Sequence, residues 1–133
     1  MRGAAAAIAS VAALVPAACG GTAGDLIALE VGGGFEGEPV RLTVTQDGRG
    51  SCDDGALEPI PSERLIEARE VERELGGVAG EGESFEAPSA PDRRSYVART
   101  QFGAVSWTEG APDLPAILPR AALLAQQLRD DLC

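Results

Sequence analysis

The sequence predicts an α+β fold, in which two helices pack on one face of a small antiparallel sheet of four to five strands. Short apolar or alternating segments separated by glycine- and proline-rich turns indicate strands, and two longer segments repeat apolar residues at helical spacing. The expected order is strand, strand, a possible short strand, helix, strand, strand, helix. That order, with helices gathered on one face of the sheet, predicts one α+β domain over residues 25–133.

The beginning of this domain is expected to supply the middle of the sheet. Residues 26–31 (LIALEV) are apolar at nearly every position, which indicates a central strand. Residues 39–45 (PVRLTVT) alternate with a period of two and predict a second strand. A turn is expected at residues 47–50 (DGRG), followed by a possible short third strand at Ser51 and Cys52.

A charged surface helix is expected over residues 61–75. Ser62 is a suitable N-cap, and the glycines at 76 and 77 are expected to end the helix. Three Arg/Glu pairs spaced three apart are expected on its solvent side, namely Arg64/Glu67, Arg69/Glu72 and Glu70/Arg73. Its buried stripe should be Leu65, Ala68, Val71 and Leu75.

The end of the domain is expected to hold a loop, a hairpin and a helix. Residues 78–94 are rich in Gly, Glu, Ser and Pro and predict a mobile loop, held down by Phe85. Residues 95–102 and 104–108 predict a hairpin whose core-facing residues are Tyr96 and Trp107. The last helix is expected over residues 119–132, with Ala121, Leu124, Leu128 and Leu132 buried and Arg129, Asp130 and Asp131 exposed.

Residues 1–18 have the order of a secretory signal peptide. One arginine precedes an uncharged, mostly apolar run and a stretch of small residues, and the run is shorter than the roughly 20 residues that span a bilayer. A buried Ala-rich helix is the alternative, but the run has no charged residue and only Ser10 is polar, too little for the polar face that an amphipathic helix would require. We expect the protein to be exported, and residues 20–24 (GGTAG) to be a short tether.

Cys19 is the expected lipid attachment site. Ala17, Ala18 and Cys19 look like a lipobox, in which the Cys receives a diacylglyceryl group that holds the protein at the membrane. Pro16 stands where an aliphatic residue is usual, so ordinary cleavage after Ala17, which would give a secreted protein, remains the alternative.

The other two cysteines, Cys52 and Cys133, form a natural pair if Cys19 is acylated. Their disulfide would close about 80 residues and contribute about 4–5 kcal/mol in the chain-entropy model. Two unrelated free thiols are the alternative. Two cysteines without histidine do not make the four-ligand site that zinc prefers, so no metal is expected.

The composition argues against an enzyme and against nucleic-acid binding. The formal net charge is −10, all eleven basic residues are arginine, and there is no histidine. An acidic chain repels phosphate backbones, and a chain without His or Lys lacks the commonest general base and the Schiff-base amine. We therefore expect no catalytic residues and no cofactor.

Two short motifs are better explained as turns than as sites. Residues 32–37 (GGGFEG) contain G-x-G-x-x-G, but a strand follows where a dinucleotide site needs a helix. Asp53 and Asp54 precede Gly55, but they lack the spacing and the distal Glu of an EF-hand, so we expect solvated turn acids. Carboxylate catalysis by Asp53 and Asp54 is a weaker alternative.

The element order and the turn after the first strand resemble emfourin, the bacterial inhibitor of the thermolysin-like metallopeptidase protealysin. The matching residues are 29–37 (LEVGGGFEG), the strand 40–45, the hairpin from Tyr96, and the closing helix with its Leu-Pro start at Leu114. The resemblance spans residues 25–133, but only the Gly-Phe turn is distinctive. It does not account for the lipobox, the Cys52/Cys133 pair or the acidic loop.

The resemblance implies a binding protein that occludes a peptidase cleft outside the membrane. The expected contact loop is Gly33, Gly34, Phe35 and Gly37, in which glycines would let Phe35 enter a hydrophobic subsite; packing of Phe35 in the core is the alternative. The expected partner is a secreted metallopeptidase or another envelope protein. A non-inhibitory envelope lipoprotein with a structural or protein-interaction role is the alternative function, because a fold does not fix a function.

Overall fold

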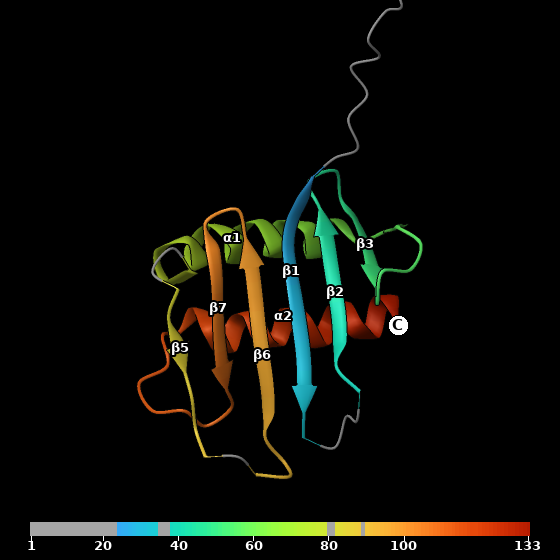
Figure 1. The fold of residues 1–133 in the computed structure, drawn as a ribbon. Helices are drawn as coiled ribbons and strands as arrows, with labels where there is room; N and C mark the ends of the chain where they lie inside the picture. The colour runs from blue at the N-terminus through green and yellow to red at the C-terminus, as the bar shows by residue number, and fades with distance from the viewer. Residues whose placement is uncertain (1–23, 35–37, 80–81, 89) are drawn as a thin grey trace, which may run out of the picture.

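The structure, a computed structural model, describes residues 24–34, 38–79, 82–88 and 90–133. It is an α+β fold of two helices and seven strands in the order β-β-β-β-α-β-β-β-α (Figure 1). The elements are β1 (Asp25–Gly33), β2 (Val40–Thr45), β3 (Arg49–Cys52), β4 (Glu58–Pro59), α1 (Ser62–Ala79), β5 (Ser84–Phe85), β6 (Arg94–Thr100), β7 (Gly103–Thr108) and α2 (Ile117–Leu132).

The strands form one sheet in the order β4-β3-β2-β1-β6-β7-β5. Neighbours are antiparallel except β5 and β7, which are parallel. The prediction that the first strand is central is confirmed, since β1 pairs with β2 on one side and with β6 on the other. The apolar run 26–31 fits this place, because Leu26, Ile27, Leu29 and Val31 are all at most 5% exposed.

The predicted number of strands was wrong, because β4 and β5 were not expected. Each has only two residues, too few to show a period-two pattern. β5 lies inside the segment predicted to be a loop. There Ser106 Oγ donates a hydrogen bond to Ser84 Oγ at 3.1 Å, and Phe85 packs half-buried against the core. The expectation that Phe85 fixes this segment is therefore confirmed.

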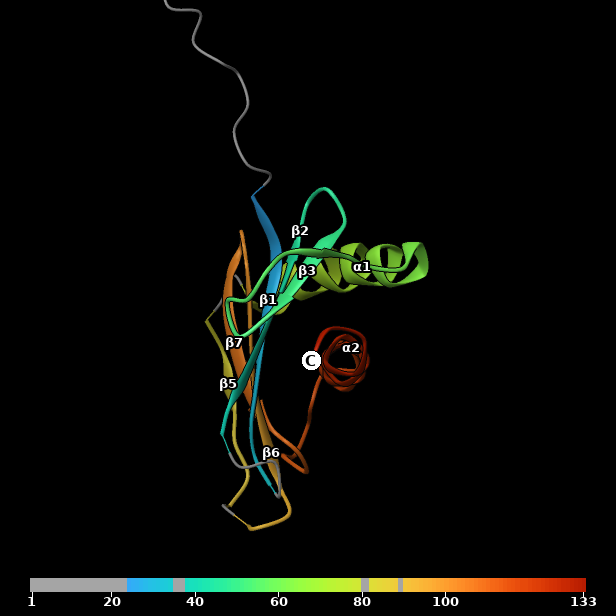
Figure 2. The ribbon, with the colours of Figure 1, turned by 90° about the vertical axis from the view of Figure 1, so that its right-hand side faces the viewer.

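Both helices lie on the same face of the sheet, as Figure 2 shows edge-on. The buried stripe of α1 is confirmed at Ala68, Val71 and Leu75, each 0% exposed, whereas Leu65 is half-buried. The predicted end of α1 was wrong, because the helix continues through Gly76 and Gly77 to Ala79. Ala79 is buried in the core, and this packing outweighs the roughly 1 kcal/mol that each glycine costs a helix.

The charges of α1 do not pair along the helix as expected. Glu67, Glu70 and Glu74 instead gather around Arg120 of α2, at 2.7, 2.5 and 3.0 Å. Other side chains of α1 also reach outside it: Arg64 binds Asp131, Arg69 binds the carbonyl of Gln46, and buried Glu72 accepts a hydrogen bond from Gln101. These charges therefore join α1 to α2 and to two turns of the sheet, which spacing within one helix could not reveal.

The last three elements follow the prediction closely. β6 and β7 form the expected hairpin, with Tyr96 opposite Trp107 and their rings stacked at 5.2 Å. Both side chains are buried, as expected. α2 begins at Ile117, two residues earlier than predicted, and buries Ala121, Leu124 and Leu128 against the sheet. Leu132 is half-buried.

Candidate functional site

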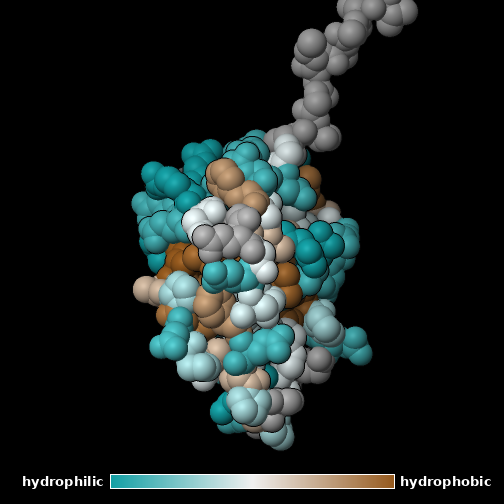
Figure 3. Space-filling model, turned by 60° about the vertical axis from the view of Figure 1, so that its left-hand side comes forward, coloured by the Kyte–Doolittle hydropathy of each residue, from teal (hydrophilic) through white to brown (hydrophobic). Residues whose placement is uncertain are grey.

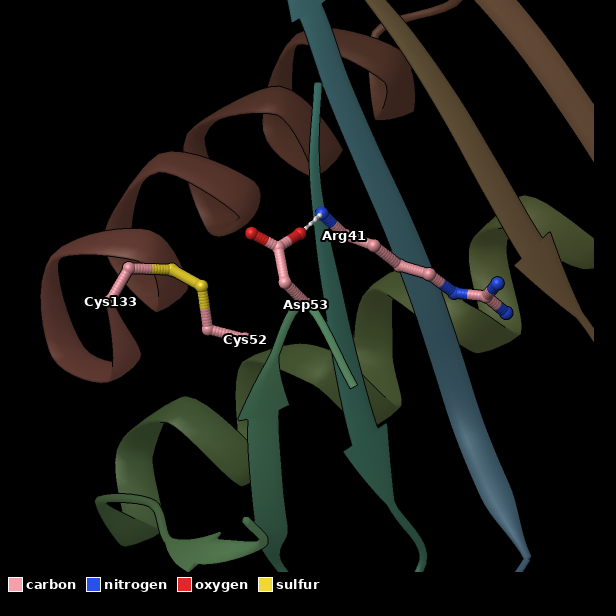
Figure 4. Close-up of a disulfide and its surroundings, with 4 residues drawn as sticks. All are labelled: Arg41, Cys52, Asp53 and Cys133. Carbon is pink, nitrogen blue, oxygen red and sulfur yellow. Dashed lines mark hydrogen bonds between the residues drawn. A yellow bond between two sulfur atoms is a disulfide. The ribbon is translucent and has the colours of Figure 1, made fainter. Parts of the chain in front are cut away.

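The expected disulfide is present between the end of β3 and the end of α2. Cys52 and Cys133 are bonded with their Cα atoms 5.6 Å apart (Figure 4). Leu132, beside Cys133, packs close to Gly50 of β3: a Cβ atom added at Gly50 would lie 2.8 Å from Leu132 Cδ1. The bridge and this close contact hold the end of α2 against the sheet, so their role is structural.

Asp53 and Asp54 belong to the turn beside this bridge. Asp53 Oδ1 accepts a hydrogen bond from the backbone N–H of Arg41 at 2.9 Å, and the Asp53 N–H donates to the Arg41 carbonyl at 2.8 Å. Figure 4 shows the Arg41 guanidinium pointing away from Asp53, toward β1. Both aspartates have positive φ values of 50° and 59°. Asp53 closes the turn, and within the described ranges no three Cys, Asp or Glu side chains are grouped as a metal would require.

The glycine turn begins where β1 ends. Gly33 pairs with Arg94 at the start of β6, and Gly33 and Gly34 have positive φ values of 73° and 62°. A Cβ atom at Gly33 would lie 2.9 Å from the Arg93 carbonyl oxygen, so both backbone shape and space require glycine there. Phe35 and Gly37, the other two expected contact residues, lie outside the described residues.

A polar hollow of about 210 Å³ adjoins this turn. Arg93 lies in its wall and donates a hydrogen bond from Nη1 to the Pro88 carbonyl at 2.7 Å. The segment predicted to be a loop thus forms a wall beside the glycine turn. The other lining residues are Gly33, Gly34, Ala87, Ala90, Pro91, Ser95 and Thr108.

A second hollow, of about 280 Å³, lies between the end of β7 and the first half of α2. Sequence reasoning missed it, because its residues come from three separate segments and read as ordinary core positions. Leu123 is 55% exposed at its rim. Figure 3 shows hydrophobic residues gathered at mid-height on this side of the molecule. The lining is mainly apolar: Trp107, Leu114, Pro119, Ala122 and Leu123, with Glu109, Gly110 and Gln126.

A hydrogen-bonded network forms the polar side of this second hollow. Tyr96 donates from its hydroxyl to Glu109 Oε1 at 3.0 Å and accepts from Gln126 Nε2 at 3.1 Å. Glu109 Oε2 also accepts from the Arg94 N–H at 3.2 Å. Burial, together with the carboxylate of Glu109, raises the pKa of the Tyr96 hydroxyl. The network fixes one wall of the hollow and leaves the apolar wall opposite.

Both hollows lie toward the end of the sheet away from the start of β1. Gly33 is at the far end of β1, Ser95 pairs with Thr108 at that same end, and Glu109 follows directly (Figure 1). Nine residues of β1, about 30 Å of strand, separate Asp25 from this end. The chain therefore enters the sheet at one end and presents its glycine turn and its hollows near the other.

The predicted signal peptide and Cys19 lie outside the described residues. Across the part of the chain that is described, neither helix has the length and apolar character needed to cross a bilayer. No protein-family model, no curated protein and no solved structure matched this chain.

Proposed function

We propose that this protein is an extracytoplasmic binding protein, tethered to the membrane through Cys19, whose binding surface is the end of the sheet that carries Gly33 and Gly34. Its resemblance to an inhibitor of thermolysin-like metallopeptidases makes a secreted peptidase of that class the proposed target. We assign no catalytic step to this protein, which would inhibit the peptidase by occluding the peptidase's cleft.

The position of the glycine turn is the observation that supports this proposal most. A tethered protein must hold its binding surface away from the lipid, and the turn lies at the opposite end of β1 from Asp25, where the tether enters. The wall formed by Arg93 and the Arg93–Pro88 hydrogen bond supports the segment beside the turn.

The test is a titration of residues 24–133 against several thermolysin-like metallopeptidases. We expect stoichiometric loss of peptidase activity. Phe35→Ala is expected to weaken inhibition at least tenfold, because a Phe in a subsite is worth about 2 kcal/mol or more. Phe102→Ala is the matched control, since Phe102 is 49% exposed and lies on the β6–β7 turn at the opposite end. Equal inhibition by both variants would exclude the glycine turn from the contact.

The second hollow favours a second candidate function, in which the protein binds an envelope protein without inhibiting a peptidase. Part of its apolar wall and the exposed rim residue Leu123 lie on α2, a different element from the turn that carries the family resemblance. A volume of about 280 Å³ suits one or two apolar side chains of a partner. Capture of an envelope protein that is lost with Leu123→Asp but kept with Phe35→Ala would support this function over inhibition.

A further inference from the structure

We propose that one end of this domain is a lipid-facing surface, which contacts anionic phospholipid headgroups and fixes the orientation of the tethered protein. The surface consists of the β2–β3 turn, the tip of the β6–β7 hairpin and one flank of α1; its side chains are Ile66, Arg69, Arg73 and Phe102. The proposal rests on the membrane anchor at Cys19 proposed above, and adds to it a face and a ligand class.

Hydrogen bonds connect this surface directly to the point where the tether enters. The Gln46 N–H donates to the Gly24 carbonyl at 2.9 Å, and Arg69 Nη2 donates to the Gln46 carbonyl at 3.2 Å. Only two hydrogen bonds therefore separate the guanidinium of Arg69 from the first described residue. In Figure 1, α1 crosses behind the sheet, and both α1 and the start of β1 lie above α2.

The charges of α1 are divided between two flanks. The carboxylates of Glu67, Glu70 and Glu74 turn toward Arg120 of α2. Ile66, Arg69 and Arg73, spaced three and four residues apart, share another flank, and all three are exposed. Three carboxylates of this helix thus face α2, where the one guanidinium of Arg120 offsets part of their charge, while Arg69 and Arg73 remain on the side nearest the tether.

The composition of this surface suits a bilayer with anionic lipids. Arg69 and Arg73 supply positive charge in a chain whose net charge is −10. Asp47, on the neighbouring turn, is paired with Arg49 at 2.9 Å. Two exposed apolar side chains accompany the arginines: Ile66 is 57% exposed, and Phe102, which packs over Gly76 of α1, is 49% exposed. Cationic and apolar side chains together are the composition of interfacial surfaces.

The tether is too short to let the domain turn over freely. Residues 20–24 span at most about 20 Å between Cys19 and Asp25, at roughly 3.5 Å per residue. β1 alone is about 30 Å long, so the far end of the sheet cannot reach the lipid unless the domain lies on its side. Each arginine near an anionic surface favours the contact about fivefold, or roughly 30-fold for the pair.

The test measures which end of the domain touches the lipid. The chain beginning at Cys19 is coupled through that thiol to maleimide lipid, in vesicles of phosphatidylglycerol and brominated phosphatidylcholine. A tryptophan probe is placed by Phe102→Trp, and by Leu123→Trp as a control of similar exposure on α2; Trp107 is buried in both. We expect the bromine atoms to quench the emission of the probe at position 102 and not that of the probe at 123.

The arginines are tested in the same vesicles. Adding Arg69→Gln and Arg73→Gln to the Phe102→Trp variant, or removing phosphatidylglycerol, should reduce its quenching to the level of the control. Equal quenching at both positions, or quenching that the arginines do not affect, would overturn the proposal. Ile66→Trp serves as a second probe if Phe102→Trp disturbs the packing over Gly76.

Because the coupling is chemical, this result does not depend on acylation in the cell. The anchor is tested separately with Cys19→Ala, which should release the protein from the membrane fraction. A variant that stayed in that fraction would contradict the anchor and leave the vesicle measurement valid.

Discussion

Removing the disulfide with the double substitution Cys52→Ala and Cys133→Ala is expected to cost a large part of the stability of this domain. The double variant avoids leaving a free thiol that could react with Cys19. The bridge joins residues 81 apart in sequence, and the chain-entropy relation gives about 4.5 kcal/mol for a loop of that length at 25 °C. A domain of this size has a total unfolding free energy of about 5–15 kcal/mol.

The corresponding fall in the melting temperature is about 20 °C. This follows from an unfolding entropy of about 2.1 cal/mol/K per residue, so that each kcal/mol shifts the midpoint by about 4 °C in a domain of about 110 residues. Urea unfolding measured by Trp107 fluorescence and by far-ultraviolet circular dichroism would give the free energy. Trp107 is buried on β7, far from the bridge in the sheet order, so it reports global unfolding.

A loss of about 1 kcal/mol or less, with Trp107 fluorescence unchanged until the helices melt, would refute this reasoning. It would mean that the bridge only prevents the end of α2 from fraying. Reduction of the unsubstituted chain is the matched comparison, because it breaks the same bond without changing the side chains that surround it.

Three further predictions concern glycine packing, one buried hydroxyl and one ion-pair cluster. Gly50→Ala should cost about 1–3 kcal/mol in urea unfolding, since its Cβ would lie 2.8 Å from a side-chain carbon of α2. Gly77→Ala, whose Cβ would have nothing within 4 Å, should instead stabilise α1 by about 0.5–1 kcal/mol. A loss of stability in both variants would refute the packing argument. Tyr96→Phe should cost about 1–2 kcal/mol. Because the pKa of Tyr96 is raised in the folded state, the Tyr96 hydroxyl contributes its full share to the unfolding free energy below pH 10, and this share is lost as the pH rises further. The unfolding free energy of the unsubstituted protein should therefore fall in this alkaline range, and that fall should be absent in Tyr96→Phe. The hydrogen bonds from Arg120 lower the pKa of Glu67, so the ionised Glu67 stabilises the fold above the ordinary Glu pKa, and this stabilisation is lost as the pH falls below that value. Arg120→Gln should therefore flatten the acid side of the plot of unfolding free energy against pH. An unchanged plot would contradict this role of Arg120.

The sequence predicted the parts of the fold whose residues repeat at a regular spacing. The apolar run 26–31 and the alternation in 40–45 each correspond to a strand, and the hairpin around Tyr96 and Trp107 corresponds to two. The two-residue strands β4 and β5 have no repeat to detect, because a neighbour in space and not their own sequence makes them strands. The end of α1 was missed for a similar reason, since the burial of Ala79 outweighs two glycines that would end an isolated helix.

The candidate site was less accessible to sequence reasoning. Cysteine counting led to the Cys52–Cys133 bond, which the structure contains. The second hollow needs Trp107, Leu114 and Leu123 from three segments, so nothing in the spacing of one segment points to it. A pattern of apolar residues predicts which side chains are buried, but not where two elements leave a space between them.

The central place of β1 has a consequence for how fast the chain folds. β2 and β3 are neighbours in sequence, as are β6 and β7, so each pair can form early as a local hairpin. β1 must then pair with β6, and the partners Ala28 and Arg99 are about 71 residues apart. Closing the disulfide first shortens that path only to roughly 58 residues, which changes the closure entropy by about 0.2 kcal/mol. The slow step is therefore expected to be the docking of the two halves of the sheet along β1, at nearly the same rate in the oxidised and the reduced chain.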